Sequence, residues 1–198
     1  MLVLVVASIA RADLFPFVNI TGNNPVDAAI GEAQMFVRVI DPGSGQVLFT
    51  FINTGPEASS ITDVYFDDGV LLGIASIEDS DPGVEFSQLA APQDLPGGNL
   101  LDPPFVTTVG FSADSDPAVQ PNGVNPGESL GILFDLASGG TFADVISQLH
   151  DGTLRIGIRV QGFESGGSES FVAVPAPGAM LLGAIGLGAV GLIKRRFA

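Results

Sequence analysis

Cysteine and tryptophan are absent from the 198-residue chain, and tyrosine and histidine each occur once. The absence of cysteine excludes a disulfide framework, thiolate metal sites and a cysteine nucleophile. The single histidine, His150, is too little for a zinc or copper site of the usual kind, and we expect it to suit a helix C-terminus rather than a catalytic triad. A hydrolase with two catalytic carboxylates is the one enzyme class left open, but sugar sites of that type generally add aromatic platforms, which are scarce here. We therefore predict that the protein is not an enzyme.

Basic residues are scarce in the middle of the chain. All 22 acidic residues fall in the segment 13–172, where Arg38, Arg155 and Arg159 are the only cations. The formal net charge of this segment is therefore −19, whereas the whole chain carries −15. Such a charge repels nucleic acids and favours solubility and the binding of cations, so we expect no nucleic-acid partner.

Charged and polar side chains are also absent from residues 178–193, and Lys194, Arg195 and Arg196 follow at once. As a helix, these 16 residues would rise roughly 24 Å, a little less than the roughly 30 Å hydrocarbon core of a bilayer. The pattern predicts a transmembrane helix with its basic end in the cytoplasm and the preceding residues outside. A buried C-terminal helix of a globular core is the alternative, although five glycines in 16 residues make a poor soluble helix.

Directly before this run, Val174, Pro175, Ala176 and Pro177 form a Pro-x-Pro motif. The motif, the apolar run and the terminal basic cluster together resemble the PEP-CTERM sorting signal of bacterial surface proteins. The resemblance implies that a membrane exosortase recognises the tail and removes it, and that the protein reaches the cell surface or an exopolysaccharide matrix. In that family a Glu usually stands between the two prolines, where this chain has Ala176. The resemblance covers about an eighth of the chain and does not bear on the activity of the rest.

The first residues also indicate export. Residues 2–9 are almost wholly apolar, and Ala10-Arg11-Ala12 fits the small-x-small cleavage pattern of a secretory signal peptide. No basic residue precedes the apolar run, and the segment is shorter than the usual 15–30 residues, so we expect the true start to lie upstream. A buried first strand is the alternative interpretation. We therefore divide the chain into a signal peptide (1–12), an acidic domain (13–172) and a sorting tail (173–198).

Short runs of β-branched and aromatic residues, separated by turn residues, recur through the acidic domain. The predicted strands are 33–40, 46–53, 61–66, 70–77, 83–88, 105–112, 129–136, 153–161 and 170–174, with connections across 41–45 and 67–69. A capping box that starts at Thr141, followed by helical spacing up to Leu149, predicts one short helix. Two long surface loops are expected at 89–104 and 113–128. The pattern predicts an all-β fold, an antiparallel β-sandwich of about eight or nine strands.

Two copies of Asp-Ser-Asp-Pro supply candidate metal ligands, Asp79 and Asp81 in the first copy and Asp114 and Asp116 in the second. Calcium takes oxygen ligands, and carboxylates two residues apart can point at one ion where the backbone curls around it. Neither copy continues into the Asp-x-Asp-x-Asp-Gly loop of a strong calcium motif, and Asp or Ser before Pro is also an ordinary turn former. Calcium binding and simple turns are therefore both kept as interpretations.

The sequence as a whole predicts an exported bacterial protein with a structural or adhesive role in the cell envelope or the exopolysaccharide matrix. Its expected partners are the secretion machinery, an exosortase, the membrane before processing, and exopolysaccharide. The alternative is a calcium-dependent module of the cell surface that binds a carbohydrate or another ligand.

Overall fold

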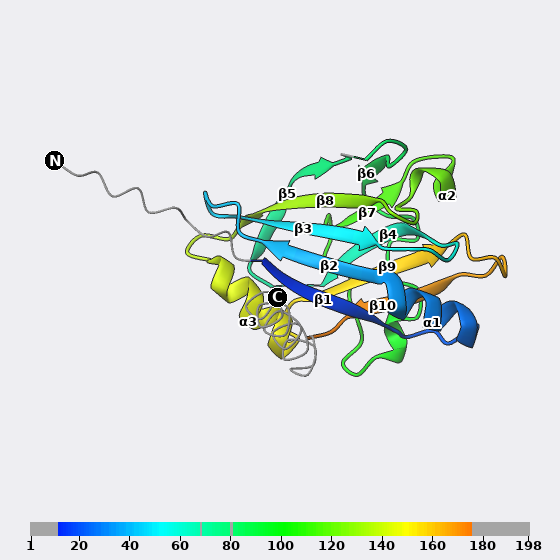
Figure 1. The fold of residues 1–198 in the computed structure, drawn as a ribbon. Coiled ribbons are helices and arrows are strands. Elements are labelled where there is room, and N and C mark those ends of the chain that lie inside the picture. The colour runs from blue at the N-terminus through cyan, green and yellow to red at the C-terminus, as the bar shows by residue number, and fades with distance from the viewer. Residues whose placement is uncertain (1–11, 68, 80, 176–198) are drawn as a thin grey trace, which may run out of the picture.

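The computed structural model describes residues 12–67, 69–79 and 81–175 (Figure 1). Within these residues lie ten strands, three α-helices and one short 3-10 helix. In chain order they are β1 Ala12–Asn19, α1 Pro25–Gln34, β2 Met35–Ile40, β3 Gln46–Asn53, β4 Ser60–Asp67, β5 Leu71–Glu78, β6 Phe86–Gln88, η1 Gly98–Leu100, β7 Ser112–Ser115, α2 Val119–Asn122, β8 Ser129–Leu136, α3 Phe142–Asp151, β9 Arg155–Gln161 and β10 Glu169–Ala173.

The strands form one antiparallel sheet in the order β5-β8-β3-β2-β1-β10-β9-β4-β7-β6. β1 joins two halves of this sheet, because its first residues pair with β2 (Leu14 with Arg38) and its last residues pair with β10 (Val18 with Val172). We call β5, β8, β3 and β2 the front half and β10, β9, β4, β7 and β6 the rear half (Figure 1). The outermost strands β5 and β6 come near each other, so the sheet is nearly closed.

Both halves turn one face toward a shared hydrophobic core. Along β3, buried residues alternate with half-buried ones, as expected for a strand with one face in the core. Phe49 of β3 packs edge-on against Phe66 of β4, with ring centroids 5.0 Å apart, and Phe134 of β8 packs on the same Phe66 ring at 4.7 Å. These contacts join the front half to the rear half. Because burial of each such ring contributes roughly 1.5–3 kcal/mol, the core can stabilise a chain that has no disulfide.

Two helices lie at opposite ends of this core (Figure 1). In α3, the capping box predicted from the sequence is present, because Thr141 and Asp144 exchange side-chain to backbone hydrogen bonds. Helix α1 begins after Asn24, whose side chain accepts a hydrogen bond from the N–H of Val26. Gly31 of α1 lies directly on the Phe171 ring, since a Cβ at this position would come within 2.2 Å of the ring carbon Cζ. The glycine is therefore required for the close approach of α1 to β10.

The expectation of an antiparallel β fold is confirmed, and the hairpin predicted over 33–53 is present as β2 and β3. The expectation of a single helix was wrong, because α1 and α2 are also present. The structure places α1 over residues assigned to no element and over the start of the predicted strand 33–40. Asn24 and Pro25 are ordinary start signals for a helix, but apolar residues are too evenly spread over α1 to give a clear helical period.

Two expectations about the strands were also wrong. Residues 105–111 form no strand; they run as a loop beside β4, where the N–H of Phe66 donates to the carbonyl of Phe111 at 2.9 Å. The polar run Ser-Ala-Asp-Ser of β7, which lies partly in a predicted loop, takes the place beside β4 instead. The turn at 67–69 does not close a hairpin, because β4 pairs with β7 and β9 whereas β5 pairs with β8. Residues 67–69 therefore connect the two halves of the sheet.

The part of the chain that the structure describes contains no helix long and apolar enough to cross a membrane. The predicted transmembrane helix at 178–193 lies outside the described residues, as do residues 1–11 of the predicted signal peptide. Of the predicted sorting signal, the structure describes Val174 and Pro175.

Candidate functional site

The outer face of the rear half carries a cluster of polar side chains beneath a long loop. This covering loop, residues 89–111, lies over β4 and β9, and it explains why all eight residues of β4 are buried. Leu95 of the loop packs on Gly157 of β9, where a Cβ would come within 2.6 Å of Leu95 Cδ2. Tyr65 and Phe105 are buried in the same small apolar cluster as Leu95. Its first part, residues 89–104, was expected as a surface loop, but Leu95 and Phe105 are buried against the sheet, so the loop covers it.

Asp63 on β4 and Asp114 on β7 occupy facing positions on neighbouring strands. Asp63 is only 1% exposed, and its carboxyl accepts hydrogen bonds from the hydroxyls of Thr62 (2.7 Å) and Tyr65 (3.3 Å). The two carboxyls lie close enough that the charge of Asp114 acts on Asp63. Arg159 on β9 is a distant ion-pair partner, with its Nη1 4.0 Å from Asp63 Oδ2. We call Asp63, Asp114, Tyr65 and Arg159 the carboxyl cluster.

The environment of the carboxyl cluster favours protonated groups. Burial raises the pKa of Asp63 to about 6, and the nearby charge of Asp114 acts in the same direction, against the hydrogen bond from Thr62 and the charge of Arg159. Burial also raises the pKa of Asp114. The pKa of Tyr65 is raised as well, by burial and by the charge of Asp63, so the phenol stays protonated. Asp63 therefore changes its protonation state near neutral pH.

The carboxyl cluster holds the start of the covering loop. The N–H of Ala91 donates to Asp114 Oδ2 at 3.2 Å, and the N–H of Ala90 donates to the hydroxyl of Ser112 at 3.0 Å. The Tyr65 hydroxyl lies 3.1 Å from the carbonyl oxygen of Pro92. Strands β4 and β7 thus fix three successive residues of the loop through side chains that point away from the core.

A second anchor holds the end of the same loop. Arg155 of β9 forms an ion pair with Asp67 and donates hydrogen bonds to the carbonyl oxygens of Pro103 and Pro104. Asp67 Oδ2 also accepts a hydrogen bond from the N–H of Val106 at 3.0 Å. The guanidinium carbon of Arg155 lies 5.3 Å from the centroid of the Phe105 ring, at cation–π distance. Arg155 and Arg159, two of the three cations between residues 13 and 172, therefore both lie on β9 under this loop.

The carboxyl cluster contains groups of the kind that act as general acids and bases, but a substrate has no open path to Asp63. A general acid or base must come within hydrogen-bond distance of its substrate, and Asp63 is closed off while the covering loop is in place. The hydrogen bonds of Asp114 and Tyr65 to the loop account for the polar groups without a substrate. The arrangement is therefore that of a polar latch that fixes the loop on the sheet.

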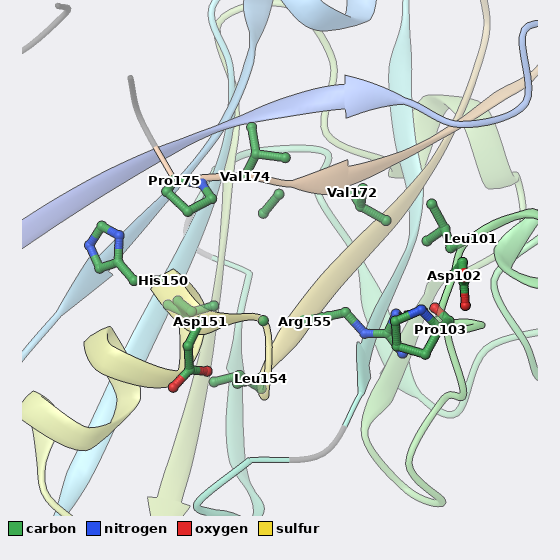
Figure 2. Close-up of a pocket in the computed structure, with 13 residues that line it drawn as sticks. Leu101, Asp102, Pro103, His150, Asp151, Leu154, Arg155, Val172, Val174 and Pro175 are labelled. Atoms are coloured by element: carbon green, nitrogen blue, oxygen red, sulfur yellow. Dashed lines mark hydrogen bonds between the residues drawn. The ribbon is translucent and has the colours of Figure 1, made fainter. Parts of the chain in front are cut away.

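An open pocket of about 430 Å³ lies at the end of the described chain, between α3, the end of β10 and the covering loop (Figure 2). Leu154, Val172 and Val174 give it apolar walls, and His150 and Asp151 border it. The His150 ring packs against the Phe15 ring with centroids 5.5 Å apart, as expected for a residue that ends a helix against the core. These groups do not form a triad.

The sorting-signal residues within the described chain lie at this pocket. Val174 and Pro175 line it, and the N–H of Val174 donates to the carbonyl of Pro16 at 3.0 Å. This bond continues the pairing of β10 with β1 by one residue. The other predicted signal residues, Ala176, Pro177, Lys194, Arg195 and Arg196, lie outside the described residues.

The four candidate calcium ligands are divided between different surroundings. Asp81 Oδ2 accepts hydrogen bonds from the N–H (2.6 Å) and the hydroxyl (2.9 Å) of Ser129, and Asp114 belongs to the carboxyl cluster. Burial raises the pKa of Asp79, and the charge of Asp116 raises it further, so one acid from each Asp-Ser-Asp-Pro copy lies near the other. Across residues 12–67, 69–79 and 81–175, no group of three or more acidic or histidine side chains is arranged to hold a metal ion.

A second buried carboxylate, Glu169, was not singled out from the sequence. It is 1% exposed and accepts hydrogen bonds from the side chains of Asn19 and Thr21 and from the N–H groups of Asn23 and Asn24. Burial acts to raise the pKa of Glu169, but these hydrogen bonds outweigh it and the pKa is lowered. Glu169 thus stays charged and fixes the turn that leads into α1.

Comparison with known proteins gives no match: no family model fits the chain, and no curated protein or solved structure resembles it closely enough to count. Arguments about function therefore rest on the residues and their geometry.

Proposed function

We propose that the protein is an exported structural or adhesive component of a bacterial cell surface or exopolysaccharide matrix, sorted by its PEP-CTERM-like tail. In this proposal the body is a β-sandwich without enzyme activity, formed by the front and rear halves packed through rings such as Phe49 and Phe66. The tail enters the membrane as a helix over 178–193 until an exosortase removes it.

The proposal rests on the position at which the folded body ends. Every strand of the described residues lies between Ala12 and Ala173, and the hydrogen bond from Val174 to Pro16 comes directly before the Pro-Ala-Pro motif. Removal of the residues after this point takes away none of these strands. Because β1 and β10 are neighbours in the sheet, both predicted targeting segments also leave the body from adjacent strands. A processed body and an unprocessed chain can therefore share one fold.

The rear face supports a structural role for the body. Its Asp67, Asp114 and Arg155 side chains hydrogen-bond to the covering loop. The acidic surface keeps an exported chain soluble and suits contact with cations in a matrix.

The test compares the full chain with a chain that lacks residues 175–198, both expressed in a bacterium that has an exosortase. We expect the full chain in the surface or matrix fraction and the truncated chain in the medium or the periplasm, with the same thermal midpoint for the two bodies. A variant with Lys194, Arg195 and Arg196 changed to Ala tests the basic cluster separately, because it keeps the motif and the apolar run. Recovery of the full and truncated chains in the same fraction would refute the sorting role.

A calcium-dependent binding module is the second candidate, favoured by the closeness of Asp79 and Asp116 from the two acidic copies. On this alternative, calcium raises the thermal midpoint, and the change of both residues to Asn abolishes the rise. Equal midpoints in calcium and in chelator would eliminate this candidate. Glycan-array binding with and without calcium would identify a carbohydrate ligand.

A further inference from the structure

The outer face of the front half differs from the rear face because, among the described residues, no loop or helix is assigned over it. On β2 and β3 the residues that alternate with the core positions are largely apolar. Phe36, Ile40, Leu48 and Ile52 point away from the core and are only half-buried. Leu133 continues this surface on β8. We call the outward residues of β2, β3, β8 and β5 the bare face.

The register aligns the bare face in rows across the strands. One row contains Ile40, Leu48 and Leu133, with Ser76 of β5 at its end. The neighbouring row contains Arg38, Thr50, Gly131 and Glu78 in that order. An exposed cation on β2 and an exposed anion on β5 thus stand at the two ends of one row, and small residues lie between them.

No side chain projects from Gly131 in the middle of the charged row, and side chains of its neighbours lie over it. A Cβ on Gly131 would come within 3.1 Å of Glu78 Cβ and 3.4 Å of Leu48 Cδ1, so both side chains lie across the glycine. At about 4.8 Å between strands, the backbones of Arg38 and Glu78 are roughly 14 Å apart, and the two side chains form no ion pair with each other. Neither side chain has an ion-pair partner among the described residues.

Because of this order of charges, the bare face of one copy is complementary to the bare face of a second copy. If two copies face each other across a two-fold axis that runs parallel to the strands between β3 and β8, each β2 position lies opposite the partner's β5 position. Such an arrangement brings Arg38 of each copy to the partner's Glu78 in the same row, and it brings Leu48 to the partner's Leu133. Sheets that pack with nearly aligned strands are a common arrangement, at about 10 Å separation.

We propose that the bare face binds a second copy of this chain through this two-fold contact. A third row contains Phe36, Ile52 and Ser129. Four strands and three rows cover roughly 400 Å² per copy at ordinary strand spacing, below the roughly 800 Å² per partner of a stable interface. The contact is therefore weak, as suits reversible association in a matrix. The large negative charge of the body opposes association, so the contact forms more readily when salt screens that charge. The inference gives a partner to the structural role proposed above, but it is measured in solution and does not depend on sorting.

The test uses charge reversal and analytical ultracentrifugation of the full chain in mild detergent. It is repeated with the chain truncated after Pro175, provided that a cooperative melt shows that this chain is folded. We expect a monomer–dimer equilibrium for the wild type that strengthens from 20 to 300 mM salt. Arg38→Glu alone and Glu78→Arg alone should each weaken dimerisation at least tenfold, because each variant places like charges opposite each other.

An equimolar mixture of the two single variants should regain dimerisation, because in a mixed dimer both charge pairs again have opposite signs. Glu164→Arg, an exposed site near α1 and away from the bare face, controls for the change in net charge. Failure of the mixture to associate, or equal dimerisation in all variants, overturns the proposal. A wild type that is monomeric at all salt concentrations overturns it too, and binding of an exopolysaccharide in place of a second copy would assign the face to that partner.

Discussion

Asp63 of the carboxyl cluster leads to a prediction about how the stability of the fold depends on pH. Burial raises the pKa of this carboxyl from 3.8 to about 6 in the folded protein. Because the folded state binds this proton more tightly than the unfolded chain does, the stability that the proton contributes is fully present below about pH 4. It is lost as the pH rises through about 6. Two pKa units correspond to about 3 kcal/mol, so at pH 7.5 the buried Asp63 destabilises the fold by roughly that amount.

The substitution Asp63→Asn removes the charge and keeps one oxygen that can accept the hydrogen bond from Thr62, while the Tyr65 hydroxyl still has the carbonyl of Pro92 as an acceptor. We expect it to raise the free energy of unfolding by about 2–3 kcal/mol at pH 7.5 and by only about 1 kcal/mol at pH 4.5. For a domain of this size, the gain corresponds to roughly 4–12 °C in thermal midpoint. Ion pairing offsets little of the gain, because Arg159 lies 4.0 Å from the carboxyl.

The assay is urea unfolding of wild type and variant at four pH values between 4.5 and 7.5. Asp94→Asn, an exposed position on the covering loop, is the matched control and should leave the pH dependence as it is in the wild type. The informative quantity is the difference between variant and wild type, since the carboxyl groups that do not interact with Asp63 cancel in it. If that difference is the same at pH 4.5 and 7.5, or if the variant is less stable at pH 7.5, the reasoning about a buried, proton-binding Asp63 is refuted.

Three further predictions concern the other contacts. Gly31→Ala should destabilise the fold by about 2–3 kcal/mol, because its Cβ would collide with the Phe171 ring, whereas Gly73→Ala, which meets open space, should change the thermal midpoint little. Glu169→Gln should lower the free energy of unfolding by about 2 kcal/mol at pH 7 and by less near pH 3. The reason is that a carboxylate with a lowered pKa contributes stability that is lost as the pH falls. Equal losses at both pH values would contradict this. Arg155→Lys keeps the charge but loses the forked hydrogen bonds to the covering loop, so amide hydrogen exchange in the end of that loop should speed up while the core stays protected; unchanged exchange there would show that the anchor is dispensable.

Much of the sheet could be predicted from the sequence because its signals are local. β9 has strict alternation of apolar and polar residues, and the turn between β2 and β3 is rich in Gly and Pro. The Thr141 capping box likewise identified α3. These patterns depend on neighbours within a few residues, so they survive without knowledge of the rest of the fold.

The candidate site could not be predicted in the same way. Asp63 and Asp114 become neighbours only because β4 pairs with β7, and β7 is a short polar run that resembles a turn. The Asp-Ser-Asp-Pro context made Asp114 a candidate for a calcium ligand or a simple turn, and this context carries no information about the strand beside it. Burial of Asp63 depends on Leu95 and the covering loop, whose Pro- and Gly-rich composition indicates an exposed segment. Tertiary contacts decided each of these outcomes.

The central claim is that the chain is exported and that its C-terminal tail serves as a removable sorting signal. Mass spectrometry of the protein recovered from the surface or matrix of the cells that produce it tests this claim most directly. We predict a mature chain that has lost the apolar run 178–193 and the basic residues after it, while the body up to Ala173 is intact. A surface protein that retains Lys194, Arg195 and Arg196, or a protein found only in the cytoplasm, would contradict it.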